Sequence, residues 1–319
     1  MTSPQTPTDA GSAPSAAPPE KVHDVLCLGE PMLEFSEETE GRYLRGFGGD
    51  TSNVAIAVAR AGARAAYATR LGDDPFGEMV LALWAGDGVD ATAVIRDPSA
   101  PTAHYFVHQG KGGHTFTYAR KGSAASLMRP GDLSRRAVET ARVLHLSGIT
   151  CAISAGARAL AEEAVDMARA CGTRVSFDLN YRPALSTPDE ARAVALTMFS
   201  KADVALPSLE EAELVFGLTR PEAILDKVLS LGPKVVALTM GAGGAWVATP
   251  EGRWRIGPVQ VRPVDASGAG DTFDGYFLSG LTAGDDLVLA ATRANAAAAM
   301  STTRRGAVAG IPYAAEVVV

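Results

Sequence analysis

The chain has 319 residues, of which 47% are hydrophobic and 20% charged, so it can bury the core of one large domain. Its net charge of -7 argues against a nucleic-acid partner, which normally meets a basic face, while a few local arginines would suffice for an anionic small molecule. Three widely spaced cysteines, Cys27, Cys151 and Cys171, argue against a disulfide framework or a zinc site and fit a reducing compartment.

Residues 1–21 are rich in Pro, Ala, Ser and Thr and lack large apolar side chains, which predicts a disordered tail. They contain no basic region followed by an apolar stretch, and no later segment is long and apolar enough to span a bilayer. We therefore expect residues 22–319 to form the folded domain of a cytoplasmic enzyme without a membrane partner.

Beyond the tail, short β-rich runs alternate with longer runs of helical period. The runs that predict buried strands are 24–29, 142–148, 173–180, 202–207 and 234–239. Helical period is found in residues 155–170, and again after Pro188. This alternation predicts an α/β fold, with right-handed crossovers and a mainly parallel sheet covered by helices on both faces.

Two stretches, 32–47 and 101–120, lack a helical period. The second carries aromatic and β-branched residues around a glycine-rich turn at 110–113, as a hairpin does. We expect both to form a small antiparallel sheet that projects from the body and covers a site as a lid; an ordinary edge hairpin is the alternative.

A stretch of small residues, "SGAGD" at 267–271, precedes a run of helical period. The backbone N–H groups of Gly268, Ala269 and Gly270 are expected to be bare at a helix N-terminus, where an anion such as a phosphoryl group is stabilised. Asp271 then has two interpretations. It is either a first-turn acid that stabilises the helix by about 0.5–2 kcal/mol or a base that accepts an alcohol proton during phosphoryl transfer.

Other glycine motifs for phosphate do not fit the sequence. "GKGG" at 110–113 lacks the spacing of a P-loop. A Rossmann fingerprint needs a third glycine where the two candidate runs have Phe273 and Trp246. Phosphate chemistry in this chain therefore requires another architecture.

Two motifs together resemble those of the ribokinase-like, pfkB-type carbohydrate kinases. "DASGAGDTF" (265–273) is similar to the D-T-x-G-A-G-D-x-F signature, and "GFGGDTSNVAIAVARAG" (46–62) is similar to the sugar-binding Gly-Gly motif. The resemblance extends from residue 22 to the C-terminus. It implies a Rossmann-type three-layer α/β sandwich with a β-sheet lid, and a homo-oligomer, often a dimer formed through the lid.

Within that family, several segments are most similar to the kinases of 2-keto-3-deoxygluconate: "GEPMLEFS", "RGFGGDTSN", the run 118–126, "HLSGIT", "FDLNYRP" and "RRGA". The resemblance implies transfer of the γ-phosphoryl group of ATP to the C6 hydroxyl of this sugar acid, giving 2-keto-3-deoxy-6-phosphogluconate in Entner-Doudoroff-type catabolism. Fructose or 2-keto-3-deoxygalactonate as acceptor, and a sugar-binding regulator without catalysis, are the alternatives.

The resemblance also implies roles for individual residues. Asp271 corresponds to the base, and Gly268, Ala269 and Gly270 to the anion hole. Sugar contacts correspond to Gly49, Asp50, Asn53, Tyr105, Tyr118, Arg120 and Arg182. Nucleotide contacts correspond to Asn180, Thr239, Gly241, Gly243, Gly244 and Asn295. Guanidinium groups suit an acceptor that carries a carboxylate, and Tyr118 and Arg120, two apart on a strand, share one face.

Mg²⁺ is expected to bridge the phosphate oxygens. The Asn-x-x-Glu element that organises Mg²⁺ in the family aligns with Ser208 and Glu211, so only the glutamate is present. A monovalent-cation site near Asp265 and Ser267 is a further possibility that the resemblance raises. Ala119, Ser186 and Ala307 depart from residues common in relatives, and these departures bear on the identity of the sugar.

Overall fold

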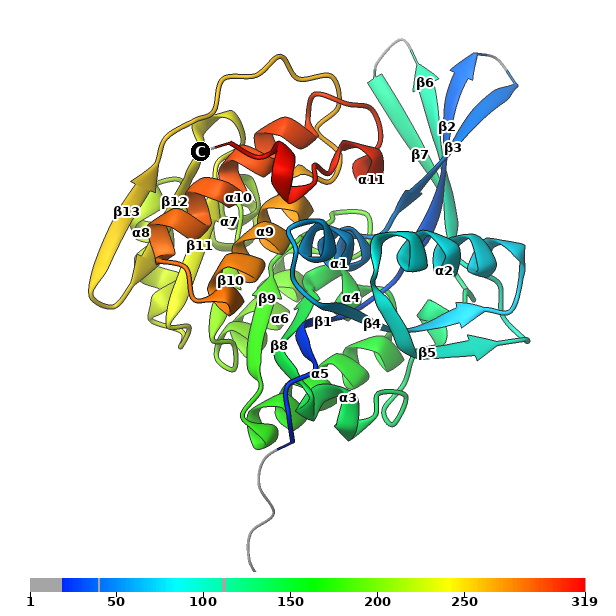
Figure 1. Ribbon diagram of the computed structural model, residues 1–319, viewed down its shortest axis with the longest axis horizontal. Coiled ribbons are helices and arrows are strands. Elements are labelled where there is room, and N and C mark those ends of the chain that lie inside the picture. The colour runs from blue at the N-terminus through cyan, green and yellow to red at the C-terminus, as the bar shows by residue number, and fades with distance from the viewer. Residues whose placement is uncertain (1–18, 40, 111–112, 319) are drawn as a thin grey trace, which may run out of the picture.

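The computed structural model describes residues 19–39, 41–110 and 113–318, which form a layered body with a small sheet projecting from it (Figure 1). Lys21, the last residue of the predicted tail, donates hydrogen bonds of 2.9 and 2.7 Å to the carbonyl oxygens of Glu139 and Ala141, so it is held against the body. Most of the predicted tail and two residues of the predicted lid turn lie outside the described residues. Within the described ranges, no helix has both the length and the apolar character needed to cross a bilayer.

A nine-stranded sheet forms the middle layer, in the order β13-β12-β11-β10-β9-β8-β1-β4-β5. Neighbouring pairs from β11 to β5 are parallel, whereas β12 and β13 pair antiparallel at one edge. The strands are β1 (His23–Leu28), β4 (Ala65–Gly72), β5 (Asp90–Asp97), β8 (Ala141–Ser147), β9 (Arg174–Asp178), β10 (Val204–Leu206), β11 (Val235–Thr239), β12 (Ala245–Thr249) and β13 (Gly252–Ile256). The mainly parallel sheet is thus confirmed, and the five predicted strands are β1, β8, β9, β10 and β11.

Four strands of this sheet lie outside the five predicted. β4 is rich in alanine and buried along nearly its whole length, so it has no alternation of polar and apolar residues. β5 lies at the edge of the sheet and is mostly half-buried, which leaves it with a mixed, partly polar sequence. β12 and β13 form an antiparallel hairpin that extends the opposite edge.

Helices cover both faces of the large sheet. One face packs against residues of α1, α2, α9, α10 and α11, and the other against residues of α3 to α8. The α-helices are α1 (Asp50–Arg60), α2 (Pro75–Asp87), α3 (Arg135–Glu139), α4 (Gly148–Ala152), α5 (Ala155–Cys171), α6 (Pro188–Phe199), α7 (Leu209–Phe216), α8 (Pro221–Leu229), α9 (Ala269–Ala283), α10 (Leu287–Ser301) and α11 (Ala307–Gly310). The described residues also form three short 3₁₀ turns, η1 (Ala125–Leu127), η2 (Gly241–Gly243) and η3 (Ala314–Glu316). The predicted three-layer α/β sandwich is confirmed.

The predicted helices form where local signals start and stop them. α5 begins after Ser154, whose side chain accepts a hydrogen bond from the amide of Ala157, and ends at Gly172 in the left-handed conformation. α6 begins after Thr187, which forms a capping box with Glu190. Each helix turns its apolar stripe toward the sheet.

The projecting sheet has four strands in the order β3-β2-β6-β7 and is formed by both predicted lid segments. The strands are β2 (Met32–Thr39), β3 (Arg42–Gly48), β6 (His104–Gly110) and β7 (Gly113–Ala119). The expectation of an antiparallel sheet is wrong at its centre, because β2 and β6 pair parallel. Both strands leave the body in the same direction, β2 after β1 and β6 after β5, and each returns through its own hairpin partner (Figure 1).

Candidate functional site

The glycine-rich turn before α9 forms a helix N-terminus, as predicted, but no strand leads into it. A loop, 257–268, connects β13 to the helix. Gly268 caps the helix with φ 75°, and a Cβ there would lie 3.0 Å from the Cβ of Ala307, so glycine fits both the conformation and the space. The expectation of three bare amides needs one correction: the Ala269 amide donates to the carbonyl oxygen of Ala266 at 3.2 Å. The amides of Gly270 and Asp271, in the first turn, have no carbonyl one turn earlier in the helix to bond.

Asp271 lies in that first turn and is 9% exposed. Its Oδ2 accepts a hydrogen bond of 2.7 Å from Nδ2 of Asn53. Burial, reinforced by the charge of Asp50, raises the pKa of Asp271 to about 7, although Asn53 and Arg182 act in the opposite direction. A carboxyl group with such a pKa can take up and release a proton near neutral pH.

The contact between Asp271 and Asn53 depends on the close packing of α9 on α1. Gly275 makes this packing possible, because a Cβ there would lie 2.4 Å from the Cβ of Ala57 and 2.8 Å from the carbonyl oxygen of Val54. Any larger residue would push the two helices apart. The helix of the Gly-Gly motif and the helix of the glycine-rich turn therefore meet side by side.

The Gly-Gly motif leads directly into α1. Gly49 has φ 101°, and a Cβ there would lie 2.3 Å from the carbonyl oxygen of Glu30, so the turn tolerates only glycine without rearrangement. Oδ2 of Asp50 accepts hydrogen bonds from Oγ of Ser147 and, at 3.3 Å, from Nδ2 of Asn180. Oδ1 of Asp50 and Oδ1 of Asn53 are buried and have no hydrogen-bond partner among the described residues. Two buried acceptors are thus left for a ligand that donates hydrogen bonds.

The lid contributes a tyrosine pair. Tyr105 and Tyr118 are directly opposite on β6 and β7, and their ring centroids are 5.6 Å apart. The Tyr105 hydroxyl donates to Oε2 of Glu34 on β2, and burial raises the pKa of Tyr105 above its usual range. A Cβ on Gly48 would lie 2.5 Å from the Tyr105 hydroxyl, so the ring lies directly over the start of the Gly-Gly motif.

Arg120 follows β7 at the base of the lid and is held by a buried carboxylate. Its Nε donates at 2.9 Å to Oε2 of Glu30, its Nη2 donates to the same oxygen, and its guanidinium lies 5.4 Å from the ring centre of Tyr118. The Glu30 side chain is fully buried and also accepts a hydrogen bond of 3.1 Å from Oγ of Ser123. Burial raises the pKa of Glu30, against the influence of Arg120 and Ser123.

A cavity of about 210 Å³ lies at the N-terminus of α9 and brings together residues from four segments of the chain. Eight of the predicted site residues line it: Asn180, Arg182, Glu211, Thr239, Gly268, Ala269, Gly270 and Asp271. Arg182 donates from Nη1 to Oε1 of Glu211 at 3.2 Å. Glu211 also forms a capping box with Ser208 at the start of α7, where the family element has its asparagine.

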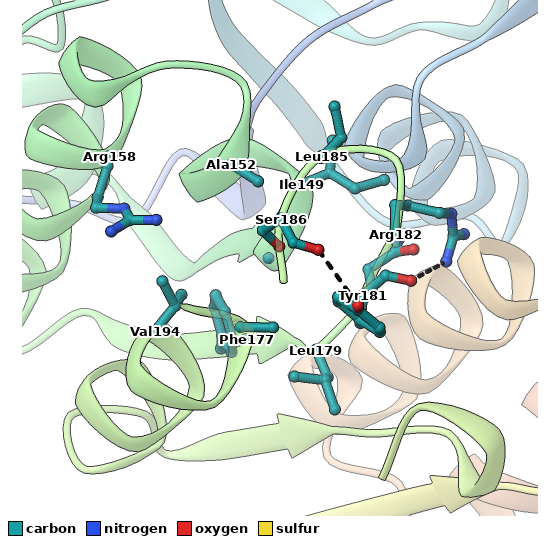
Figure 2. A pocket seen from close by; sticks show the side chains of 13 residues that line it. Ile149, Ala152, Arg158, Phe177, Leu179, Tyr181, Arg182, Leu185, Ser186 and Val194 are labelled. Carbon is teal, nitrogen blue, oxygen red and sulfur yellow. Dashed lines mark hydrogen bonds between the residues drawn. The ribbon is translucent and has the colours of Figure 1, made fainter. Parts of the chain in front are cut away.

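The wall of this cavity includes a strained residue. Asn180 has φ 34°, a left-handed conformation uncommon for a side chain other than glycine. Asn180 and its neighbours also line a second, mainly apolar pocket, shown in Figure 2, with Phe177, Leu179 and Val194 in its walls. Two hydrogen bonds form within this segment (Figure 2). The Tyr181 hydroxyl donates to the carbonyl oxygen of Ser186 at 3.2 Å, and Nη1 of Arg182 donates to the carbonyl oxygen of Tyr181 at 3.0 Å.

The predicted nucleotide residues fall into two groups. Asn180 and Thr239 line the cavity, whereas Gly241, Gly243, Gly244 and Asn295 do not. A Cβ on Gly241 would meet nothing within 4 Å, so the backbone there is open to a ligand. Gly244 has φ 87°, and a Cβ there would lie 2.3 Å from the carbonyl oxygen of Ile256, while Asn295 donates to the carbonyl oxygen of Gly257 at 2.8 Å. Gly244 and Asn295 therefore hold the backbone at Ile256 and Gly257, where β13 ends and the loop 257–268 begins.

Several residues of the site are not among those predicted. They are Glu30, Glu34, Ser147, Asp178 and Asp274. Burial, followed by neighbouring carboxylates, raises the pKa of both Asp178 and Asp274. All but Asp274 lie in the quoted segments "GEPMLEFS", "HLSGIT" and "FDLNYRP", where similarity marks the segment but not which side chain faces the cavity.

The three-layer body, the lid and a buried carboxylate at a helix N-terminus define the class of protein, a ribokinase-like phosphotransferase. A profile of the pfkB family carbohydrate kinases matches residues 22–314, and the chain belongs to that family. It is 34% identical to 2-dehydro-3-deoxygluconokinase of Thermoproteus tenax, with 91% of each chain covered, and 32% identical to fructokinase-1 of Zea mays, with 92% and 96% covered. A solved E. coli protein in complex with ATP and Mg²⁺ superposes with a TM-score of 0.85 at 26% identity, with 92% of this chain and 97% of that chain covered.

Proposed function

We propose that this carbohydrate kinase transfers the γ-phosphoryl group of ATP to the C6 hydroxyl of 2-keto-3-deoxygluconate, with Asp271 as the base. The observation that carries the proposal is the buried Asp271, in the first turn of α9 and hydrogen-bonded at 2.7 Å to Asn53 of the Gly-Gly motif. This contact joins the expected phosphoryl end of the site to the expected sugar end. The choice of sugar acid is supported by the similarity to the enzyme from Thermoproteus tenax.

The chemistry follows from these groups. A carboxylate with a pKa of about 7 is too weak a base to ionise an alcohol in advance, so the proton moves to Asp271 late, as the new O–P bond forms and the bond to the leaving ADP oxygen breaks. The free amides of Gly270 and Asp271 and the positive end of the α9 dipole stabilise the negative charge of the phosphoryl group in transfer.

The acceptor lies between α1 and the lid. The unpartnered oxygens of Asp50 and Asn53 accept hydrogen bonds from sugar hydroxyls, since they are the buried acceptors left open beside Asp271. Gly49 permits close approach of the backbone, and Tyr105 and Tyr118 cover the sugar from the lid. The sugar carboxylate is recognised by the guanidinium groups of Arg120 and Arg182.

The nucleotide extends from the α9 N-terminus toward the η2 turn, past Asn180 and Thr239 and over Gly241, Gly243 and Gly244, with Asn295 supporting the loop. The residues present fit Mg²⁺ bound mainly by phosphates: Glu211 and Asp178 offer carboxylate oxygens in the cavity, and no group of three or more ligands in the described part of the chain could hold a metal ion alone. When bound, the ion neutralises charge on the phosphate oxygens. Asp265 and Ser267 remain the candidates for a monovalent cation.

Fructose is the second candidate acceptor, and a specific observation favours it. Both arginines assigned to the sugar carboxylate already pair with carboxylates, Arg120 with Glu30 and Arg182 with Glu211. Glu34 adds a further acidic group beside Tyr105. Such a balance of charge suits a neutral sugar as well as an acid, and fructokinase-1 of Zea mays is almost as similar. 2-Keto-3-deoxygalactonate and a regulator without catalysis are the remaining alternatives.

Coupled ADP-release assays on 2-keto-3-deoxygluconate, 2-keto-3-deoxygalactonate and fructose separate these alternatives. We expect the highest kcat/KM with 2-keto-3-deoxygluconate. Good turnover of fructose without turnover of the sugar acids would refute the acceptor, and no turnover of any sugar would favour the regulator. Arg120→Ala should chiefly raise KM for the acids, and equal weakening for fructose would count against the assigned carboxylate contact.

We also propose a cytoplasmic homodimer formed through the lid. Leu44 and Phe116 occupy one row across the lid face that carries Tyr118, and all three are about half exposed. Burying such a row in a partner would remove apolar surface from water. Light scattering after size-exclusion chromatography should give twice the chain mass, and Phe116→Arg should reduce it to that of a monomer.

A further inference from the structure

We infer that Glu30 sets the charge selectivity of the acceptor site by cancelling the charge of Arg120. The inference concerns the same site and rests on the proposed function. Glu30 follows β1 and is 1% exposed, and its side chain faces the base of the lid and not solvent. Among the described residues, its oxygens are bonded by Arg120 and Ser123.

The guanidinium of Arg120 presents two edges, and Glu30 takes one of them. Nε and Nη2 both donate to Oε2 of Glu30, while Nη1 has no hydrogen-bond partner in the described part of the chain. Nη2 also lies 3.8 Å from Sδ of Met32. Because Nη2 also donates to that sulfur, the edge at Nη1 is the part that keeps its hydrogens open for an acceptor, since a guanidinium carries five donors in a fixed fork.

The neighbours of Arg120 place its guanidinium at the expected sugar end of the site. Its guanidinium lies against Tyr118, which pairs with Tyr105, and Tyr105 in turn lies over Gly48. Glu30 itself contacts the Gly-Gly motif, because its carbonyl oxygen occupies the space that a side chain on Gly49 would need. One buried residue thus touches both the sugar-binding turn and the arginine assigned to the sugar carboxylate.

The consequence is electrostatic. Glu30 and Arg120 together carry no net charge, so an anionic acceptor meets a hydrogen-bonding edge but not an uncompensated cation. The pair has little water around it, which makes its charges act strongly on a neighbouring group. Glu30 thus holds Arg120 in place and weakens the preference for acids over neutral sugars.

Glu30→Gln separates these two effects. The amide oxygen of glutamine can still accept from Nε and Nη2 of Arg120, and its NH₂ group can donate to Oγ of Ser123. The variant therefore keeps Arg120 in position but removes the negative charge of Glu30. We expect the ratio of kcat/KM for 2-keto-3-deoxygluconate to that for fructose to rise at least tenfold, through a lower KM for the acid. A merely structural role would lower both values together and leave the ratio unchanged.

Asp87→Asn is the matched control. The Asp87 side chain is 4% exposed, and its Oδ1 accepts a hydrogen bond of 2.8 Å from Nε of Arg60, so the pair joins the end of α2 to the end of α1. Loss of the Asp87 charge should lower the melting temperature without changing the ratio of kcat/KM for 2-keto-3-deoxygluconate to that for fructose.

An unchanged or lower ratio in Glu30→Gln overturns the inference even if the wild-type enzyme is a sugar kinase. If the wild-type protein turns over neither sugar, the proposed function fails, and binding of both sugars is then measured by isothermal titration calorimetry. Tighter binding of the acid alone to the variant would still support the role of Glu30, and no gain would refute it.

Discussion

Nδ2 of Asn53 donates a hydrogen bond of 2.7 Å to Oδ2 of Asp271, across 218 residues of sequence. The two side chains come from α1 and α9, which pack together because Gly275 brings no side chain to the contact. The amide holds one carboxylate oxygen and leaves the other for a proton. A carboxyl group that is buried, oriented and close to neutral in pKa has the properties of a general base.

Replacement of Asp271 by asparagine should abolish proton acceptance while preserving shape. We expect kcat to fall by about 10²–10⁴-fold, with ATP affinity largely unchanged because the amides of the turn remain. Steady-state kinetics and calorimetric titration with ATP measure the two effects. An unchanged kcat would rule out Asp271 as the base.

The pH dependence of the reaction should report the same group. Because the pKa of Asp271 is about 7 and the base must be ionised, kcat/KM should rise with pH and level off above this value. The assay needs saturating ATP and a buffer series from about pH 5.5 to 9, which brackets that pKa, with the coupling enzymes in excess at each pH. A flat profile through this range would contradict a raised pKa of Asp271 in the ATP-bound enzyme that meets the acceptor.

Ionisation of Asp271 should also cost stability. Between the unfolded pKa near 3.8 and the folded pKa of about 7, the folded state retains a proton that the unfolded state has lost. The folded state is therefore destabilised as the pH rises through this window, by at most about 4 kcal/mol. We expect Asp271→Asn to raise the melting temperature at about pH 8 and to leave it nearly unchanged at about pH 4. A variant less stable than wild type at the higher pH would argue against the cost of burying this charge.

Gly49 should tolerate no side chain, and Gly62 provides a matched control. Both have φ near 100°, but a Cβ on Gly62 would meet nothing within 4 Å, whereas one on Gly49 would lie 2.3 Å from the carbonyl oxygen of Glu30. Gly62→Ala should cost about 1 kcal/mol from the left-handed backbone alone, and Gly49→Ala about 1–3 kcal/mol more from the clash. Chemical denaturation of both variants gives the difference. Equal losses would show that the turn can shift to accommodate the methyl group.

Much of the fold follows from short-range patterns. Helical period located α5 and α6, and apolar runs located the central strands, because these signals depend on neighbours within a turn or two. The same patterns did not predict edge strands such as β5, since half-buried strands mix polar and apolar residues. The parallel pairing of β2 with β6 could not be predicted from either segment alone, because it depends on where each strand leaves the large sheet.

The sequence by itself determined the family motifs, the position of Asp271 at a helix start and the need for glycine around it, since backbone conformation and first-turn amides are local properties. Tertiary structure alone decided that Asp271 is buried against Asn53, that its pKa rises, and that Arg120 is already paired with Glu30. Burial and charge pairing depend on residues distant in the chain, and these set both the strength of the base and the charge that a sugar meets.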